Sequence, residues 1–250
     1  MTILDFIDII KGMLKEFFRG LTDMLFPKTC LSCKTRLITE ALICPDCKNK
    51  IKINIPPFCI RCGKHLENKN LNKNVCPACR KTPLYFDRAF SPCIYEGVIQ
   101  KLIHQFKYGN KRSLSPVLAG LMNEFIREYG IYLDFIDWII PIPLSSARMR
   151  EREYNQSELL SRHIAQEIQK KVSQDILIRS RNTLTQTGLK HSQRRENVKG
   201  SFKVRDCKPI KGRNLLLIDD VLTTGATASE AAYTLKNAGA NVVFVLTLAN

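Results

Sequence analysis

The 250-residue sequence predicts an α/β fold in which a parallel sheet is flanked by helices, preceded by a small Cys-rich zinc-binding module and an N-terminal helix. Apolar runs alternate with amphipathic stretches from Asp87 onward, eight of the ten cysteines form pairs between residues 28 and 85, and an apolar stripe follows residues 3–25. We therefore divide the chain into an amphipathic helix over 1–26, a double zinc-binding module over 27–86 and an α/β domain over 87–250.

The N-terminal segment has apolar residues at helical spacing from Ile3 to Leu25. Two roles are open for this helix: it packs on the body of the protein, or it lies at a membrane surface or against a partner protein. Its four acidic side chains offset its three basic ones, which weakens the membrane interpretation.

The cysteines of the second segment have the spacing of zinc ligands. Two thiolates that are separated by two residues reach one tetrahedral ion, and two such pairs complete a Cys₄ site. Two structural zinc ions are therefore expected, with the four pairs combined either sequentially or in alternation, and an iron–sulfur cluster is a minor alternative. The eight metal ligands are Cys30, Cys33, Cys44, Cys47, Cys59, Cys62, Cys76 and Cys79. Cys93 and Cys207 lie outside this pattern and are interpreted as buried small residues.

The composition indicates where the protein is located and which kinds of partner it binds. Thirty-nine basic against 23 acidic residues give a net charge of +16 and a pI near 9.5, which favours a polyanionic partner such as nucleic acid, a phosphorylated metabolite or an anionic membrane face. No apolar run approaches the roughly 20 residues that a membrane span needs. The N-terminus lacks the pattern of a secretory signal, so we expect a cytoplasmic protein, with a peripheral contact at the inner face of the membrane left open.

The α/β domain is predicted element by element. Strands are expected over 87–97, 137–144, 214–221 and 240–249, and helices over 98–109, 116–130, 156–172 and 227–239. Residues 180–200 are polar, basic and without a period, so we expect a functional loop there.

The segment 215–228 carries the clearest chemistry. Four apolar residues form a buried strand that ends in Asp219 and Asp220, at the edge of an α/β sheet where ligands bind. Hydroxyls and backbone N–H groups of the following turn, together with a helix N-terminus, suit a phosphate dianion, and the two carboxylates suit the hydroxyls of a sugar. These turn residues are Thr223, Thr224, Gly225, Ala226 and Thr227. The alternative is a helix N-cap with solvated carboxylates, and the Gly-Lys-Ser/Thr of a Walker A loop is absent.

This segment matches the binding signature for 5-phosphoribosyl 1-pyrophosphate (PRPP) of type I phosphoribosyltransferases. With the cysteine pairs, it resembles the ComF family of competence-associated proteins from about Pro27 to the end of the chain. Further markers of the resemblance are Tyr95-Glu96-Gly97, Phe106-Lys107-Tyr108-Gly109, residues 141–156, Gln186 to Leu189, and Arg194-Arg195-Glu196-Asn197-Val198. The chain departs from the family at Glu153, where glycine is usual, which affects the predicted anion loop.

The resemblance implies a type I phosphoribosyltransferase fold and a role for each matching residue. Asp219 and Asp220 are the catalytic pair, and Mg²⁺ accompanies PRPP. The 5′-phosphate contacts are Val221, Thr223, Thr224, Gly225, Ala226 and Thr227, and the pyrophosphate contacts are Arg148, Arg152, Lys190 and Arg194. The basic stretch 180–200 matches the family's mobile flap. We interpret Lys107 as a surface charge, with a phosphate contact as its alternative, and find no nucleobase pocket in the sequence.

The function implied is a PRPP-dependent phosphoribosyltransferase, that is, a pentosyltransferase, with the acceptor and the retention of catalysis left open. The resemblance also implies a role in natural transformation and binding of single-stranded DNA. The expected partners are PRPP or ribose 5-phosphate, single-stranded DNA, and other DNA-uptake proteins such as a helicase or recombination factors. The alternative is a nucleobase salvage phosphoribosyltransferase with no role in DNA handling.

Overall fold

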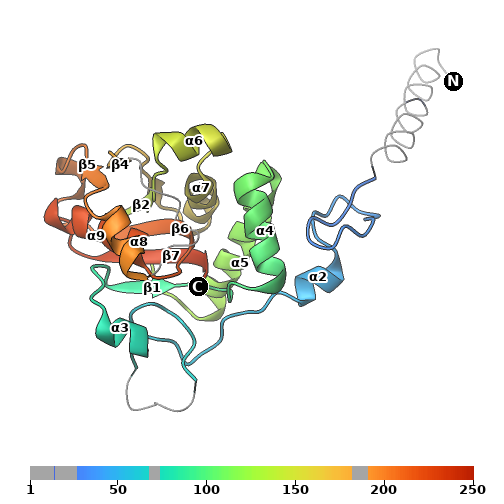
Figure 1. Cartoon of the computed structure of the whole chain (residues 1–250), viewed down its shortest axis with the longest axis horizontal. Helices are drawn as coiled ribbons and strands as arrows, with labels where there is room; N and C mark the ends of the chain where they lie inside the picture. Colours follow the sequence, from blue (N-terminus) through green and yellow to red (C-terminus); the bar gives the residue numbers. More distant parts are fainter. Residues whose placement is uncertain (1–13, 15–26, 68–73, 182–190) are drawn as a thin grey trace. The chain divides into compact units, whose positions relative to one another are not determined.

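The computed structural model describes Leu14 and residues 27–67, 74–181 and 191–250 (Figure 1). The helix predicted over 1–26 therefore lies outside the described residues, apart from Leu14. The chain divides into two compact units, Met1–Ile51 and Lys52–Asn250.

The first unit contains one short helix, α2 (Pro45–Asn49), within its described part. Cys44 is the N-cap residue of α2, and its sulfur accepts a hydrogen bond from the backbone N–H of Cys47. An antiparallel bridge joins Thr29 to Arg36. This arrangement turns the chain back so that both cysteine pairs of the unit come together.

The second unit contains the other helices and the sheets. Its strands are β1 (Arg88–Phe90), β2 (Trp138–Pro141), β3 (Lys171–Val172), β4 (Leu177–Arg179), β5 (Phe202–Val204), β6 (Leu215–Val221) and β7 (Val243–Ala249). Its α-helices are α3 (Pro77–Lys81), α4 (Gly97–Tyr108), α5 (Ser115–Glu128), α6 (Ser146–Arg152), α7 (Gln156–Ile168), α8 (His191–Val198) and α9 (Ala226–Asn237). Single 3₁₀ turns are η2 (Arg112–Leu114) and η3 (Lys208–Ile210).

The main sheet is five-stranded and parallel, with the strand order β1-β7-β6-β2-β3. Leu217 of β6 pairs with Ile140 of β2 on one side and with Val245 of β7 on the other. The side chains of β6 from Leu215 to Ile218 are completely buried, as expected for a central parallel strand covered on both faces.

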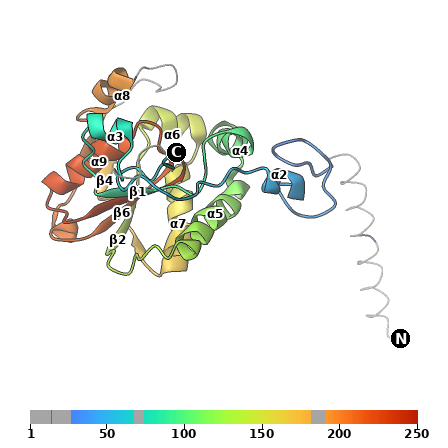
Figure 2. The same cartoon turned by 90° about the horizontal axis from the view of Figure 1, so that it is seen from below.

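Helices cover the two faces of this sheet (Figure 2). Helices α5 and α7 pack together against β2, β6 and β7, and α9 packs against the opposite face. Leu215 and Leu217 share a core with Ala228, Ala231 and other small residues of α9, which lets this helix approach the sheet closely. The rigid centre of the fold therefore holds the end of β6 and the start of α9.

The predicted fold class, a parallel α/β sheet flanked by helices after a Cys-rich module, is confirmed. Several elements differ from the prediction. The strand expected over 87–97 is limited to β1, and residues 171–172 form β3 instead of extending the preceding helix. The loop expected over 180–200 contains α8, whose polar sequence has no apolar face to reveal it. The short antiparallel pair β4–β5 was not predicted.

Candidate functional site

The cysteines form two separate four-sulfur groups. Cys30, Cys33, Cys44 and Cys47 make the first cysteine set, and Cys59, Cys62, Cys76 and Cys79 make the second cysteine set. Within each set, all four sulfurs lie within 4.8 Å of one another, so the pairs combine sequentially and not in alternation.

Both sets fit a structural zinc ion. The sulfurs of Cys33 and Cys44 lie 3.7 Å apart, as do those of Cys62 and Cys76, and a tetrahedron with Zn–S bonds of about 2.3 Å has edges of about 3.8 Å. Backbone N–H groups point at the sulfurs of Cys30 and Cys59, which suits thiolates. Four protein ligands leave no open coordination position, so these ions would be structural.

The second cysteine set is built into the α/β unit. The amide of Asn54 donates to the carbonyl oxygens of Gly63 and Ser91, both at 2.8 Å, and the backbone N–H of Ala89 donates to the carbonyl oxygen of Arg61. Cys62 and Cys79 pack against the core that lies under α9. This cysteine set is therefore continuous with the packing that positions the start of α9.

A cleft of about 580 Å³ opens at the carboxyl end of β6. It brings together most of the sequence-predicted site residues: Arg148, Arg152, Arg194, Asp219, Asp220, Val221, Thr223 and Thr227. The sequence analysis assigned no site role to several other residues that line it: Tyr95, Gln100, His104, Tyr108 and Arg179. Of the remaining predicted contacts, Thr224, Gly225 and Ala226 continue the loop into α9, while Lys190 lies outside the described residues.

Asp219 and Asp220 occupy different environments in this cleft. The carboxylate of Asp219 accepts hydrogen bonds from the Ser157 hydroxyl at 3.0 Å and from the backbone N–H of Asp220 at 2.9 Å. The carboxylate of Asp220 lies 2.6 Å from the ammonium of Lys107, and both side chains are largely buried. Interpreting Lys107 as a surface charge was therefore wrong: α4 carries it into the cleft.

Burial and the nearby charge of Asp220 raise the pKa of Asp219 from its ordinary value of 3.8 to about 6, although Lys107 opposes the rise. Above about pH 6 the folded chain therefore carries a carboxylate that would be more stable in the unfolded chain. Protonation removes this cost as the pH falls from about 6 towards 4.

This raised pKa predicts the stability of a single variant. Asp219→Asn should raise the Tm of the ligand-free chain by several degrees at about pH 8, because asparagine still accepts the Ser157 bond without a buried charge. The gain should shrink below about pH 5. Thermal unfolding across this pH range measures it, with the exposed Asp175→Asn as a control that should show no such gain. A lower Tm for Asp219→Asn at about pH 8 would contradict the assignment.

Arginine side chains crowd this cleft. Burial, followed by the charge of Arg148, lowers the pKa of Arg179 to about 10. The pKa of Arg148 is lowered as well, by burial and then by the charge of Arg152. The guanidinium of Arg152 lies 4.9 Å from the ring centre of Tyr108 and donates to its hydroxyl at 3.2 Å. Like charges held this close favour a multiply charged anion between them.

The loop between β6 and α9 has the geometry of an anion cradle. Gly225 is the N-cap residue of α9 and has a φ of +72°, a conformation that glycine adopts without strain. The hydroxyl of Thr224 accepts from the backbone N–H of Ala226, and the first turn of the 12-residue α9 directs its N–H groups and positive dipole end at the loop. From α8, Arg194 donates to the Thr223 hydroxyl at 3.2 Å.

Glu153, where the chain departs from the family that it resembles, has an unusual backbone conformation. It ends α6 with a φ of +62°, in the left-handed region that favours glycine. Its carboxylate accepts from the Asn110 amide at 3.1 Å and lies 3.6 Å from Arg112, so its charge is engaged next to the cleft.

Comparisons with known proteins match the cysteine-rich segment to a domain family and most of the chain to several relatives. Residues 21–83 match the model of the double zinc ribbon domain. The chain is 31% identical to competence protein F of Haemophilus influenzae over 224 residues, which is 88% of this chain and 96% of that protein. It is 30% identical to the DNA utilization protein YhgH of Salmonella typhimurium, over 88% of this chain and 95% of that protein. It is 27% identical to competence protein ComFC of Bacillus subtilis, over 79% of each.

Two of the solved structures with a similar arrangement are enzymes. An allosteric regulatory enzyme of purine biosynthesis gives a TM-score of 0.39 at 16% identity, over 58% of this chain and 29% of that chain. The hypoxanthine-guanine phosphoribosyl transferase of L. donovani gives a TM-score of 0.30 at 14% identity, over 54% and 69%. Within the described part of the chain, no helix combines the length and the apolar character needed to cross a membrane.

Proposed function

Since the chain belongs to the ComF family of competence-associated proteins, we propose that it binds PRPP in the cleft at the carboxyl end of β6. The observation that carries this proposal is an acidic pair, with Asp220 buried and Asp219 partly buried, that shares one cleft with a cluster of arginines and the start of α9. The three parts match the three chemical parts of the ligand: a diol, a phosphate monoester and a pyrophosphate.

Each end of the ligand has partners of the required charge. The N–H groups of Gly225 and Ala226 and the Thr223 hydroxyl would hold the 5′-phosphate, which would replace the Thr224 hydroxyl as the acceptor of the Ala226 N–H. Asp219 and Asp220 would accept hydrogen bonds from the ribose hydroxyls. Arg148, Arg152 and Arg179 would surround the pyrophosphate. Bound Mg²⁺ would neutralise charge on the pyrophosphate, as oxygen-rich ligands allow.

The chemistry that this arrangement supports is displacement at C1 of the ribose. The bond from C1 to the pyrophosphate oxygen breaks, its electron pair leaves with pyrophosphate, and a nucleophile of the acceptor forms the new bond to C1. Fixed guanidinium groups stabilise the charge that develops on the leaving oxygen. Lys107 acts as a positioning residue, since it fixes the carboxylate of Asp220.

Arg179 provides a test that separates the two ends of the ligand. Arg179→Ala should reduce the affinity for PRPP by about tenfold or more, because one charge-assisted contact is lost. The affinity for ribose 5-phosphate should be nearly unchanged. Calorimetric titration of both ligands measures this split, and Arg205→Ala is the control, since Arg205 is an exposed arginine on the far end of β5. Equal losses for both ligands, or binding of neither ligand to the unaltered chain, would refute the assignment.

Binding of single-stranded DNA is a second proposed function, favoured by an exposed aromatic pair. The rings of Tyr85 and Tyr233 lie 4.7 Å apart, and both residues are more than 40% exposed. The backbone N–H of Tyr85 donates to the Ser229 hydroxyl, which fixes this ring next to α9. Arg195 and Arg61 donate to the carbonyl oxygens of the two residues before Tyr85. Aromatic faces beside cations suit the stacked bases and phosphates of a single strand.

Removing this pair should weaken single-stranded DNA binding. Tyr85→Ala with Tyr233→Ala should reduce affinity for a poly-dT oligonucleotide by about tenfold, since stacking contributes about 1–3 kcal/mol per base. Fluorescence anisotropy measures this, with Tyr132→Ala as the control because Tyr132 is exposed elsewhere. The unaltered chain should also lose affinity steeply with salt. Unchanged affinity in the double variant would exclude this surface. Contacts with a helicase or recombination factors stay a prediction of the resemblance.

A further inference from the structure

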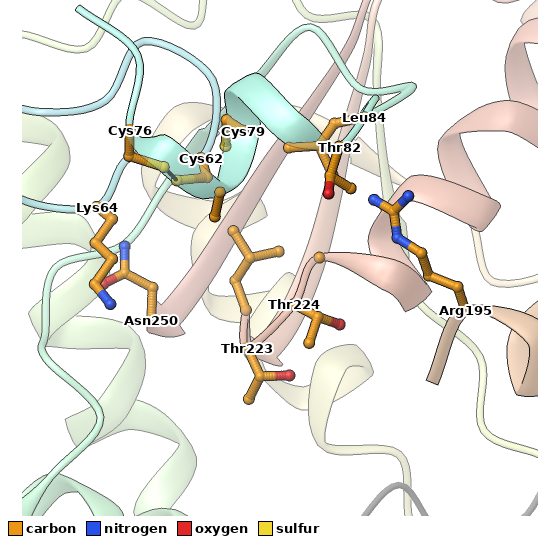
Figure 3. Close-up of a pocket in the computed structure, with 13 residues that line it drawn as sticks. Cys62, Lys64, Cys76, Cys79, Thr82, Leu84, Arg195, Thr223, Thr224 and Asn250 are labelled. Carbon is orange, nitrogen blue, oxygen red and sulfur yellow. Dashed lines mark hydrogen bonds between the residues drawn. The ribbon is translucent and has the colours of Figure 1, made fainter. Parts of the chain in front are cut away.

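A second pocket, of about 410 Å³, adjoins the cleft and shares Thr223 with it. Figure 3 shows Cys62, Cys76 and Cys79 on one side of this pocket and Thr223 and Thr224 on the other. Of the proposed phosphate contacts, Thr223 and Gly225 also line this pocket, whereas the proposed diol and pyrophosphate contacts do not. The pocket therefore lies between the second cysteine set and the loop that precedes α9.

A zinc ion does not account for this space. Three cysteines of the second cysteine set line the pocket but Cys59 does not, so the centre of the four sulfurs lies at its edge. The pocket is also lined by Leu84, Leu222 and Arg195, none of which belongs to the second cysteine set. Its volume is also far larger than one ion fills, and is sufficient for one or two fused rings.

The polar groups around the pocket include two cations and a buried amide donor. Lys64 and Arg195 are the only cationic side chains that line it among the described residues, and they lie at its two ends in Figure 3. Arg195 is held in place by its bond to the carbonyl oxygen of Pro83. The Asn250 amide nitrogen is buried and has no hydrogen-bond partner within the described part of the chain. A buried donor of this kind requires an acceptor from a ligand or water.

Apolar side chains line part of the pocket. Leu84 and Leu222 line it, together with Ala78 of α3. Apolar side chains between two cationic ends suit a flat ring that carries acceptor groups or negative charge at its edge. The shared Thr223 places such a ring directly beside the site proposed for the phosphoribosyl group.

We propose that this pocket binds a planar heteroaromatic ring bearing an acidic group, with the second cysteine set as one wall and Lys64 as the partner of the acid. The proposal rests on the proposed function, since it assigns the ring-bearing substrate class to the site next to the PRPP cleft. It also explains why a zinc-binding element forms part of the α/β unit, because the ring would lie directly against it.

Matched ring pairs test this proposal on the zinc-loaded full chain. Nicotinate and orotate should bind saturably by calorimetry in the presence of ribose 5-phosphate, and nicotinamide and uracil, which lack the carboxylate, should bind about tenfold more weakly or not at all. Lys64→Met should remove most of this preference for the acid, whereas Lys101→Met, a change of an exposed lysine on α4, should leave it intact. Asn250→Ala should also weaken the binding of nicotinate and orotate.

The proposal would be overturned by no binding of either acid, by equal binding of the acids and their neutral counterparts, or by a preference that Lys64→Met leaves unchanged. Binding of a dT oligonucleotide through Lys64 without binding of the acids would also overturn it. Ribose 5-phosphate titrated alone separates the two proposals. If ribose 5-phosphate binds and the two acids do not, only the ring-pocket proposal is refuted. If the acids bind and ribose 5-phosphate does not, only the phosphoribosyl assignment is refuted.

Discussion

Replacing both Asp219 and Asp220 by alanine is expected to abolish the stabilisation that PRPP and Mg²⁺ give to the protein. A ligand at about a hundredfold excess over its Kd stabilises the native state by about 2.7 kcal/mol, which corresponds to a Tm increase of about 5–10 °C for a chain of this size. The two carboxylates are the described acceptors at the end of β6 that face the cleft between the phosphate loop and the arginines. Their loss should reduce this increase to nearly zero.

The increase on adding ligand, and not the Tm itself, is the quantity to compare. Removing Asp220 leaves the largely buried ammonium of Lys107 without its partner, so the double variant should start from a lower Tm. Asp219→Asn with Asp220→Asn keeps the shape of the site and should lose the increase as well. Asp175→Ala, which removes an exposed carboxylate near β4, should keep it. An undiminished increase in both double variants would refute the diol assignment.

The two cysteine sets are expected to differ sharply in their effect on the cleft. Cys76→Ser with Cys79→Ser should destabilise the α/β unit by more than about 10 °C in Tm and abolish PRPP binding, since structural zinc contributes directly to folding. Cys44→Ser with Cys47→Ser should leave PRPP binding within about twofold of the unaltered chain, because the first cysteine set belongs to the separate unit Met1–Ile51. Each variant should lose one of the two zinc ions by elemental analysis.

The packing around Gly225 is the physical reason for this difference. A Cβ on Gly225 would lie 3.3 Å from a methyl group of Leu84 and 3.6 Å from the ring of Phe86, so the chain that leaves the second cysteine set supports the phosphate loop. The N–H of Tyr85 adds a bond to Ser229 in the first turn of α9. Equal loss of PRPP binding in the two serine variants, or in neither, would contradict this account.

The parts of the site that are adjacent in the sequence were predictable. β6, the loop and α9 follow one another, so the order of apolar strand, acids, hydroxyls and glycine is sufficient to predict a ligand-binding turn. The cysteine spacing likewise predicted two Cys₄ sites, although the sequence left their pairing open until the sulfurs were placed.

The parts that depend on tertiary contacts were not predictable. The spacing of α4 assigns Lys107 to a polar face but does not show that this face meets Asp220. Arg179 ends the three-residue strand β4, which is too short for a periodic signal. Tyr85 and Tyr233 become neighbours only because the chain that follows the second cysteine set packs along α9.

A crystal structure of the zinc-loaded chain with bound ribose 5-phosphate tests the central assignment most directly. We expect the phosphate oxygens within hydrogen-bond distance of the N–H groups of Gly225 and Ala226, and the ribose hydroxyls against the carboxylates of Asp219 and Asp220. A sugar phosphate bound away from the loop, or bound there with its hydroxyls turned from both acids, would contradict the account.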